Sequence, residues 1–554
     1  MTRSRFFGLA ERSPTGFLLL ALAALALYIF TSFVLLDNSA VTFMDRDPSK
    51  RDAFEREKIF VHVTSTNRFG NSIGNASRVL EKLASKPETT AKGMTWKLLT
   101  PNIKIGKPFH ILVTTPGNGG DFILARIHRF DDEYYSRYSA SGKVDDLHNG
   151  NYLVTFVAHW TGSTSVSITL FYTSQVITFI KSYKKLTYFF SCFYDHEIRS
   201  SGVGTFGPAR TVLLKNNLTW GECLFDNRPV IMRGEVTCDL SYPRHRWYGK
   251  CIKPKGYDCF ELQLCIYDDR MPHVRKGVLD MIVNWDNSDR DIPGPSEYVY
   301  VKTGQRPAKK KACERTQITR PQGYWANDEW VNTNCTLSCN SQSGFLRCLR
   351  KKTMFLIGDS TVRQVYEWIS DYLDIYDSYL EETYHRIWPD LNFELKFSFH
   401  GLPISSSLSV NLKRIMWISE HLNSIPAKSS ATVILTCIHH FIDLSVEEFR
   451  FRLNEISNAI RKLLARAPNV KIIFRTANPR NTNSIYINSY KVKWFNEEAI
   501  AQLKQIKEVR FLDIWDMFSG SPYSPNVHYP TNAIGEQIKE LLSLICPYKC
   551  TSKK

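Results

Sequence analysis

The sequence has few acidic residues for its number of basic ones, and it lacks the cysteine spacing of a zinc site. Of its 554 residues, 54 are Asp or Glu and 71 are Lys or Arg, so the formal net charge is +17. This charge favours acidic partners: nucleic acid, anionic glycans, a phosphate-bearing donor or a membrane surface. No Cys-x-x-Cys or His-x-His pair occurs, so we expect no metal.

One uncharged apolar segment, residues 16–36, lies near the N-terminus. It is long enough to span a bilayer. Three arginines precede it and Asp37 follows it, which predicts a cytosolic N-terminus with the bulk of the chain across the membrane. A cleaved signal peptide is the alternative, since residues 38–40 are small enough for cleavage. A lumenal chain of this kind is not expected to bind nucleic acid.

Thirteen cysteines also indicate the secretory pathway. In an oxidising lumen they predict disulfides, although their connectivity cannot be deduced from the sequence. The odd number leaves at least one thiol, and Cys192 and Cys437 are the candidates because each lies in an apolar run. Three sequons, at Asn75, Asn217 and Asn334, predict glycosylation of such a chain.

The first half of the chain after the anchor has the pattern of a β domain. Short runs rich in Ile, Val, Phe, Thr and Tyr alternate with Gly- and Asn-containing turns, which predicts an antiparallel β-sandwich. The runs are 109–115, 122–127, 152–160 and 165–172. Residues 220–267 combine aromatic residues and cysteines with little periodicity, which indicates a disulfide-stapled extension.

The second half alternates strands and helices, which implies a mostly parallel sheet with helices on both faces. The expected strands are 354–357, 432–437, 470–476 and 509–513, and the expected helices are 361–373, 446–465, 494–506 and 531–545. The fold class is therefore α+β multidomain. The predicted parts are a cytosolic tail (1–15), an anchor (16–36), a stem (37–92), a β-sandwich (93–220), a Cys-rich extension and linker (221–310) and an α/β domain (311–554).

Ser360 lies where the first of these strands meets its helix. The apolar run 354–357 ends at Gly358-Asp359, and apolar residues then recur with helical spacing from Val362. A serine on such a turn projects from the sheet edge, and its own N–H lies at a helix N-terminus, where an oxyanion is stabilised. A helix-capping turn without catalysis is the alternative.

The partner of a nucleophilic serine is expected near the C-terminus. His528 lies on a loop before the last predicted helix, a natural place for a general base. Gly401 and His440 are candidates for the oxyanion site. The backbone N–H of a glycine can approach a ligand closely, and His440 follows the expected strand 432–437, where polar side chains reach the catalytic edge of the sheet. A histidine packed at a strand end is the alternative for His440.

These motifs resemble the neurexophilin and PC-esterase domain (NXPE) family. The similarity covers nearly everything after the anchor: a neurexophilin-like β-sandwich, a Cys-rich connector and an SGNH-hydrolase-like domain with the Gly-Asp-Ser-x-x-Arg form of the PC-esterases. The motifs that carry it are Gly358–Gln364, His400–Pro403, His440-Phe441, Asn526–His528 and Ile534–Ile538.

The resemblance implies a carbohydrate O-acetyltransferase of the secretory pathway that acetylates sialic acid on glycans, with acetyl-CoA as the acetyl donor and no bound cofactor. It would be a type II protein of the Golgi lumen, or secreted after cleavage. An acyl-glycan esterase is one alternative. A catalytically inactive ligand, with a cell-surface protein bound to the β-sandwich, is another.

One departure from the family pattern affects catalysis. SGNH enzymes usually carry Asp three residues before the histidine, whereas this chain has Pro525. The imidazole would then have to be oriented by Asn526, Asp513 or Asp516. Losing an orienting carboxylate can lower a rate by about 10⁴.

Overall fold

The computed structural model describes most of the chain after the predicted stem. The described residues are 91–129, 138–182, 187–194, 206–207, 219–232, 234–268, 290–296, 298–304, 313, 318–337, 339, 341–374, 379–382, 384–404, 409–410, 415–480, 488–523 and 526–546. The predicted anchor and the sequons at Asn75 and Asn217 lie outside these residues. Among the described helices, none is both long and apolar enough to cross a bilayer. Asn334 is exposed, and its amide donates to the carbonyl of Thr319.

Two antiparallel sheets form the β region. One has the order β1-β2-β6-β5 and the other the order β14-β7-β3-β4-β15-β16. Side chains alternate between buried and partly exposed along β2 and β6, as expected for sheets with one face in a core. The predicted strands at 109–115, 122–127, 152–160 and 165–172 are confirmed. Their observed bounds, with those of the other strands, are β1 Thr95–Leu98, β2 Pro108–Thr114, β3 Phe122–Arg129, β4 Tyr138–Ser141, β5 Lys143–Asp146, β6 Asn151–Val157, β7 Gly162–Tyr172, β14 Tyr298–Val301, β15 Gly323–Ala326 and β16 Glu329–Asn332.

A third sheet, of order β11-β12-β10-β8-β13-β21-β9, contains the Cys-rich region. Helix α4 (Ser174–Ser182) precedes its strands in the chain, which are β8 Thr187–Tyr194, β9 Phe206–Gly207, β10 Thr219–Asp226, β11 Thr237–Asp239, β12 Tyr248–Ile252, β13 Leu262–Asp268 and β21 Ser409–Val410. Three disulfides staple it: Cys192–Cys265, Cys223–Cys251 and Cys238–Cys259. The expectation that Cys192 is free is therefore wrong, because Cys192 and Cys265 are direct partners across β8 and β13.

Cys437 is the one free cysteine among the described residues, as predicted, and it is fully buried. Two further disulfides, Cys313–Cys335 and Cys348–Cys546, staple the C-terminal half. The second joins helix α7 (Gln342–Leu349) to the residue after the last helix, across 198 positions of sequence. It closes the α/β domain into a covalent loop.

The C-terminal sheet has the order β18-β19-β20-β17-β22-β23-β24. The five strands from β20 to β24 are parallel, and only the edge pair β18 and β19 is antiparallel. Parallel strands buried on both faces read as continuous apolar runs, which is why the sequence located four of them. Their bounds are β17 Lys352–Gly358, β18 Tyr379–Glu382, β19 His385–Trp388, β20 Phe393–Phe399, β22 Thr432–Leu435, β23 Lys471–Arg475 and β24 Val509–Leu512.

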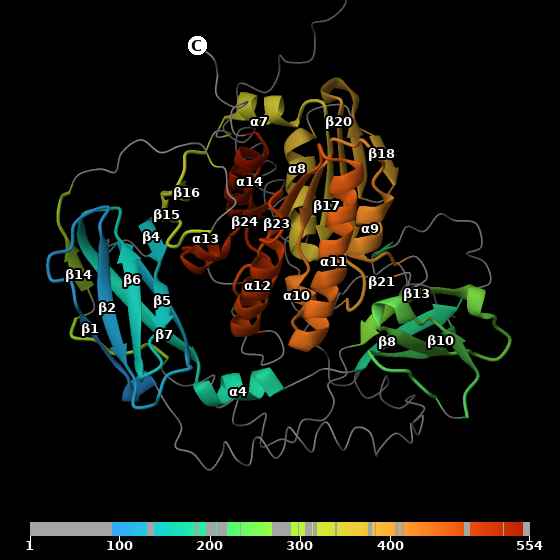
Figure 1. The fold of residues 1–554 in the computed structure, drawn as a ribbon, viewed down its shortest axis with the longest axis horizontal. Coiled ribbons are helices and arrows are strands. Elements are labelled where there is room, and N and C mark those ends of the chain that lie inside the picture. The colour runs from blue at the N-terminus through green and yellow to red at the C-terminus, as the bar shows by residue number, and fades with distance from the viewer. Residues whose placement is uncertain are drawn as a thin grey trace, which may run out of the picture. The chain divides into compact units, whose positions relative to one another are not determined.

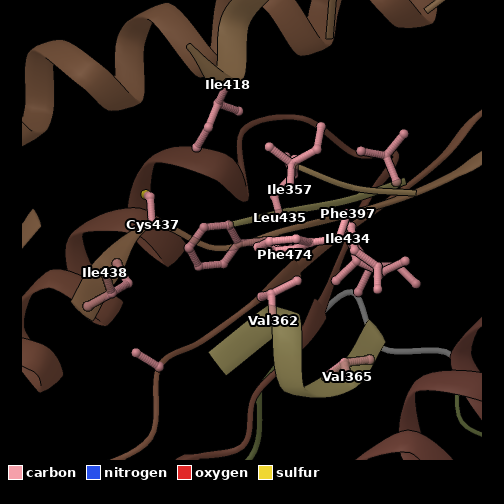
Figure 2. Close-up of a cluster of buried hydrophobic side chains, with 14 of the residues drawn as sticks. Ile357, Val362, Val365, Phe397, Ile418, Ile434, Leu435, Cys437, Ile438 and Phe474 are labelled. Atoms are coloured by element: carbon pink, nitrogen blue, oxygen red, sulfur yellow. The ribbon is translucent and has the colours of Figure 1, made fainter. Parts of the chain in front are cut away.

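Helices flank this sheet (Figure 1). Helix α11 contacts α9 and α12, whereas α14 contacts α7 and α8, so the helices form two groups. The four predicted helices are confirmed, with bounds α8 Ser360–Leu373, α11 Val446–Arg466, α12 Ser489–Leu503 and α14 Thr531–Ile545; the others are α9 Ile418–Ser424, α10 Ile438–Phe441 and α13 Trp515–Ser519. The apolar face of α8 packs on the sheet in the core shown in Figure 2, where Val362 and Val365 belong to the same buried cluster as Phe474.

The long-range disulfide generates a prediction about stability. Removing Cys348–Cys546 by Cys348→Ala and Cys546→Ala frees a loop of 198 residues in the unfolded chain. Chain entropy alone then predicts a loss of about 5 kcal/mol of unfolding free energy. Urea denaturation of the full chain measures it. Cys437→Ala, which removes a buried thiol outside any disulfide, is the matched control and should lower stability far less; equal losses in the two variants would contradict the prediction.

Candidate active site

Ser360 occupies the predicted strand-to-helix turn. Strand β17 ends at Gly358, Asp359 caps the next helix, and Ser360 is the first residue of α8. A Cβ at Gly358 would come within 3.0 Å of Thr436, the residue after the neighbouring strand β22, so the turn needs a glycine. The chain passes from β17 to β20 on one side of it and later crosses to β22 on its other side, so the direction of the connections reverses beside β17. Ligands of parallel α/β sheets bind at such switch points, outside the carboxyl ends of the strands.

His528 and Ser360 are brought together across 168 residues of sequence. The His528 Nε2 lies 2.8 Å from the Ser360 Oγ, within hydrogen-bond distance. Burial lowers the pKa of His528; Asp359 acts in the opposite direction, and Arg363 and Arg480 lower it further. The imidazole is therefore neutral at neutral pH and can accept the serine proton. Ser360 itself is only partly buried, so a substrate can reach its hydroxyl.

A buried polar network fixes the turn that carries Ser360. The Asp359 carboxylate accepts from the Thr361 N–H at 2.9 Å and the Thr361 hydroxyl at 2.6 Å. The guanidinium of Arg475, at the end of β23, donates to the Thr361 hydroxyl and to the Gln537 side chain in α14. Burial by itself would raise the pKa of Asp359, but His439, His440 and the Thr361 hydrogen bond outweigh it and lower the pKa. The sequence reasoning missed Arg475, although a lone arginine inside an apolar strand was a visible signal.

Three buried histidines lie beside the turn. The His400 Nε2 and the His440 Nδ1 are 2.9 Å apart. Burial lowers the pKa of His400 and of His439 to about 3, and that of His440 to about 4. They are therefore polar but uncharged at neutral pH. His439 and His440 lie on the short helix α10, not at the end of the predicted strand 432–437, because β22 ends at Leu435.

Gly401 directly follows His400 at the end of β20. Its φ of 88° lies in the left-handed region that only glycine adopts without strain. A Cβ there would also approach the Trp417 ring to 2.9 Å. The backbone at this position is thus held close to Trp417. The oxyanion role of Gly401 stays a prediction.

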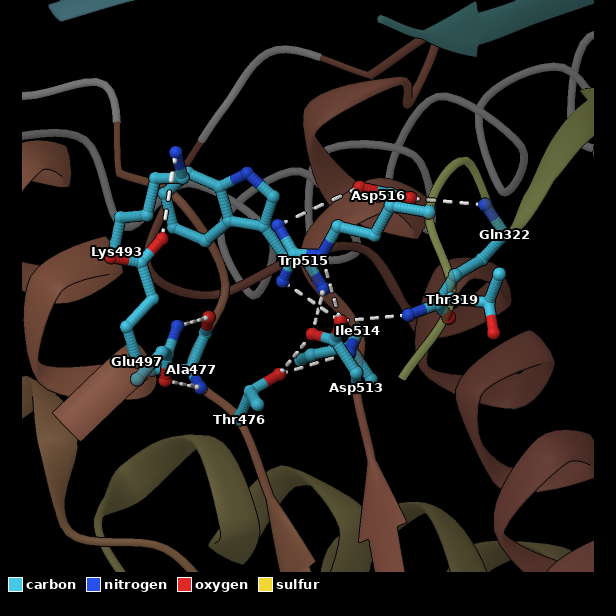
Figure 3. A network of polar contacts seen from close by, with 12 residues as sticks. Thr319, Gln322, Thr476, Ala477, Lys493, Glu497, Asp513, Ile514, Trp515 and Asp516 are labelled. Atoms are coloured by element: carbon cyan, nitrogen blue, oxygen red, sulfur yellow. Dashed lines mark hydrogen bonds and ion pairs between the residues drawn. The ribbon is translucent and has the colours of Figure 1, made fainter. Parts of the chain in front are cut away.

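The structure places Asp513 and Asp516 in a separate network (Figure 3). One oxygen of Asp513 accepts from Arg320 at 2.8 Å and from Gln322 at 2.7 Å, and the other accepts from Thr476. Asp516 accepts from the Gln322 N–H. Among the described contacts, neither carboxylate contacts His528. They instead anchor the segment before β15 to the end of β24.

Asn526 lies in the loop that carries His528, but its side chain has no described contact with the imidazole. Its side-chain oxygen accepts from the adjacent Val527 N–H, and its carbonyl accepts from Asn478 at 3.1 Å. Pro525 lies outside the described residues. Within the described part of the chain, the Ser–His pair therefore has no carboxylate hydrogen-bonded to the histidine.

Asp516 generates a prediction about pH. Burial raises its pKa to about 6, with Arg320 opposing the shift, whereas an unfolded Asp has a pKa of about 3.9. Between pH of about 4 and 6 the Asp516 carboxyl is therefore protonated in the folded state and ionised in the unfolded state. The contribution of Asp516 to the unfolding free energy falls as pH rises through this range and stays low above it. Asp516→Asn should remove the dependence, and the unfolding free energy of the wild type relative to this variant should fall by on the order of 2 kcal/mol between about pH 4.5 and 7.

Urea denaturation at the two pH values measures this difference. Asp390→Asn, at an exposed aspartate, is the control for a lost charge. A difference between wild type and Asp516→Asn that does not change with pH would refute the role given to Asp516.

Comparison with known families supports the resemblance seen in the sequence. Residues 330–546 match the model described as NXPE family member 4-like, C-terminal domain. The match includes Ser360, Gly401, His440 and His528, and it spans the parallel sheet from β17 to β24. The C-terminal domain of this chain is therefore similar to the C-terminal domain of NXPE family members.

Proposed function

We propose that the C-terminal domain catalyses acyl transfer with Ser360 as nucleophile and His528 as general base. The observation that carries the proposal is the 2.8 Å contact between the two side chains at the N-terminus of α8. An activated serine needs a base within hydrogen-bond reach and a fixed positive dipole where the oxyanion develops. Similarity to a family that resembles the SGNH hydrolases supports the same chemistry.

The reaction we propose has two steps. The Ser360 oxygen attacks the acetyl carbonyl of a thioester donor, acetyl-CoA by resemblance, while His528 takes the hydroxyl proton. The carbon–sulfur bond then breaks, and His528 returns the proton to the leaving thiol. In the second step a sugar hydroxyl attacks the acetyl-serine, His528 accepts its proton and Ser360 regains it as the acetyl ester leaves. One nucleophile serving two substrates implies this double displacement.

The tetrahedral intermediates need donors for their oxyanion. The Ser360 N–H lies at the N-terminus of α8, and we assign Gly401 N–H and His440 as the further donors. A neutral His440 suits this role, because it supplies an N–H without titrating near neutral pH. Removing one such donor typically lowers a rate by about 10²–10³.

The acceptor we propose is sialic acid on glycans, a carboxylate-bearing sugar. The net charge of +17 favours an anionic substrate. The choice of sialic acid as the sugar rests on the family resemblance. The same resemblance and the predicted anchor give the proposed location, the Golgi lumen as a type II protein, or secretion if the segment is cleaved. Whether water or a sugar attacks the acetyl-serine decides between transferase and esterase, and we propose the transferase.

A second candidate function is that of a ligand without catalysis. The absence of a described carboxylate at His528 favours it, because the lost carboxylate weakens the base. The β-sandwich would then bind a cell-surface protein. Cells lacking sialate O-acetylation and expressing the full chain separate the two: acetylated sialic acids support the enzyme, and their absence supports the ligand.

The serine and histidine are tested by substitution. Ser360→Ala and His528→Ala should each lower acetylation in those cells by at least about 10³-fold, and the double variant should lose no more than either, because the two act as a unit. Ser370→Ala, which removes a buried hydroxyl from the same helix, is the matched control and should retain activity. Full acetylation by Ser360→Ala would exclude the mechanism.

The pH dependence of the nucleophile is a separate prediction. Because burial lowers the pKa of His528, the base form persists below the ordinary value of about 6.5. Labelling of Ser360 by a fluorophosphonate probe should therefore rise with pH to a plateau, with its midpoint below about 6.5. Mass spectrometry of the labelled peptide gives the rate. A midpoint above that value, or a rate independent of pH, would contradict the assignment of His528 as base.

A further inference from the structure

Asn478 connects the end of β23 to the loop that carries His528. Its side chain is 1% exposed. Its Nδ2 donates to the Asn526 carbonyl at 3.1 Å and the Val527 carbonyl at 3.3 Å, and it also lies 3.2 Å from the Pro479 carbonyl. The two residues immediately before His528 are thus held by one buried amide, which lies three residues after the end of β23.

The orientation of this amide is fixed by its neighbours. Three carbonyl oxygens surround the Nδ2, so the opposite orientation would place oxygen against oxygen. The Oδ1 then faces the His439 Nε2, 3.2 Å away, which must donate. Burial lowers the pKa of His439 to about 3, so this ring is neutral with its proton on Nε2. His439 therefore holds Asn478 in the orientation that the loop requires.

A second amide holds the other side of His528. The Gln364 Nε2 donates to the Tyr529 carbonyl at 3.1 Å. Gln364 lies one turn after Ser360 in α8, so the helix that presents the nucleophile also holds the loop of the base. The buried Tyr529 ring packs on Phe518 at 4.2 Å, and its hydroxyl donates to the Phe518 carbonyl.

We propose that Asn478 and Gln364 form a backbone clamp that positions His528 against Ser360. One amide from the segment after β23 and one from α8 fix the carbonyls on either side of the histidine, and so limit the movement of its backbone relative to the serine. A catalytic group displaced by about 1 Å can lose about 10²-fold in rate, so fixing the loop supplies part of the orientation that an orienting carboxylate gives elsewhere. Both are positioning residues, and the inference rests on the proposed function.

The first test measures hydrogen exchange in the His528 loop and does not depend on activity. Asn478→Leu and Gln364→Met keep the approximate size of each side chain, remove the amide and add no charge. Hydrogen exchange of the full chain, followed by mass spectrometry, should show the peptide containing residues 526–530 exchanging at least about 10-fold faster in Asn478→Leu. Asn332→Leu is the matched control, since Asn332 is also buried and its amide donates to Glu540 instead. Unchanged exchange in Asn478→Leu, or an equal increase in Asn332→Leu, would overturn the clamp.

The second test measures how well His528 is positioned to activate Ser360, through the rate of Ser360 labelling. Fluorophosphonate labelling of Ser360 should be about 10- to 100-fold slower in Asn478→Leu. Its pH midpoint should move up toward 6.5, because a released imidazole is better solvated. Gln364→Met should also slow the labelling and raise its pH midpoint. Asn332→Leu should change neither the rate nor the midpoint.

The outcomes separate this inference from the proposed function. A wild-type chain that labels at Ser360, with Asn478→Leu equal to it in rate and midpoint, would overturn the positioning role and leave the acyl-transfer proposal intact. A folded wild-type chain that is not labelled at Ser360 would contradict both, even with altered exchange. Slower labelling with faster exchange, confined to the two clamp variants, supports the inference.

Discussion

The candidate site depends on the parallel pairing of β17 with β20 on one side and β22 on the other. Each residue of β17 from Met354 to Ile357 has a partner on both neighbours. Parallel pairing puts the carboxyl ends of all three strands at one edge. Ser360, His400 and the α10 histidines come within a few residues of those ends, so three separate parts of the sequence meet without any long loop having to reach across the sheet.

The same arrangement brings ionisable groups into the interior, where they are held by hydrogen bonds or kept neutral. Arg475 is 1% exposed, and its hydrogen bonds connect the nucleophile turn to the last helix. Removing one of these partners would leave a buried polar group unsatisfied, which costs about 1–3 kcal/mol and more for a charged group. The histidines around it avoid that cost, since burial keeps them uncharged. The base thus works in surroundings where few groups titrate near neutral pH.

The sequence suggested Asp513 as a group that orients His528, but in the structure Asp513 binds other residues. Asp513 is bound by Arg320, Gln322 and Thr476, which together fill both its oxygens. Arg320 is nearly 200 positions earlier in the chain, so no local pattern could show this partnership. The amides of Asn478 and Gln364 contact the histidine loop instead, and they act on its backbone, which leaves no signature in the loop's own sequence.

The sequence by itself determined the local elements and the serine turn. Apolar runs of strand length, helical spacing after Val362 and the capping Asp359 are short-range features, and each is set by a few neighbouring residues. Only the tertiary structure decided which distant residues meet. It paired Cys192 with Cys265, moved His440 from a strand end onto α10, and placed Asn478 against the His528 loop. Such contacts follow from sheet order and burial, which are set by the whole domain, and so a single stretch of sequence does not contain them.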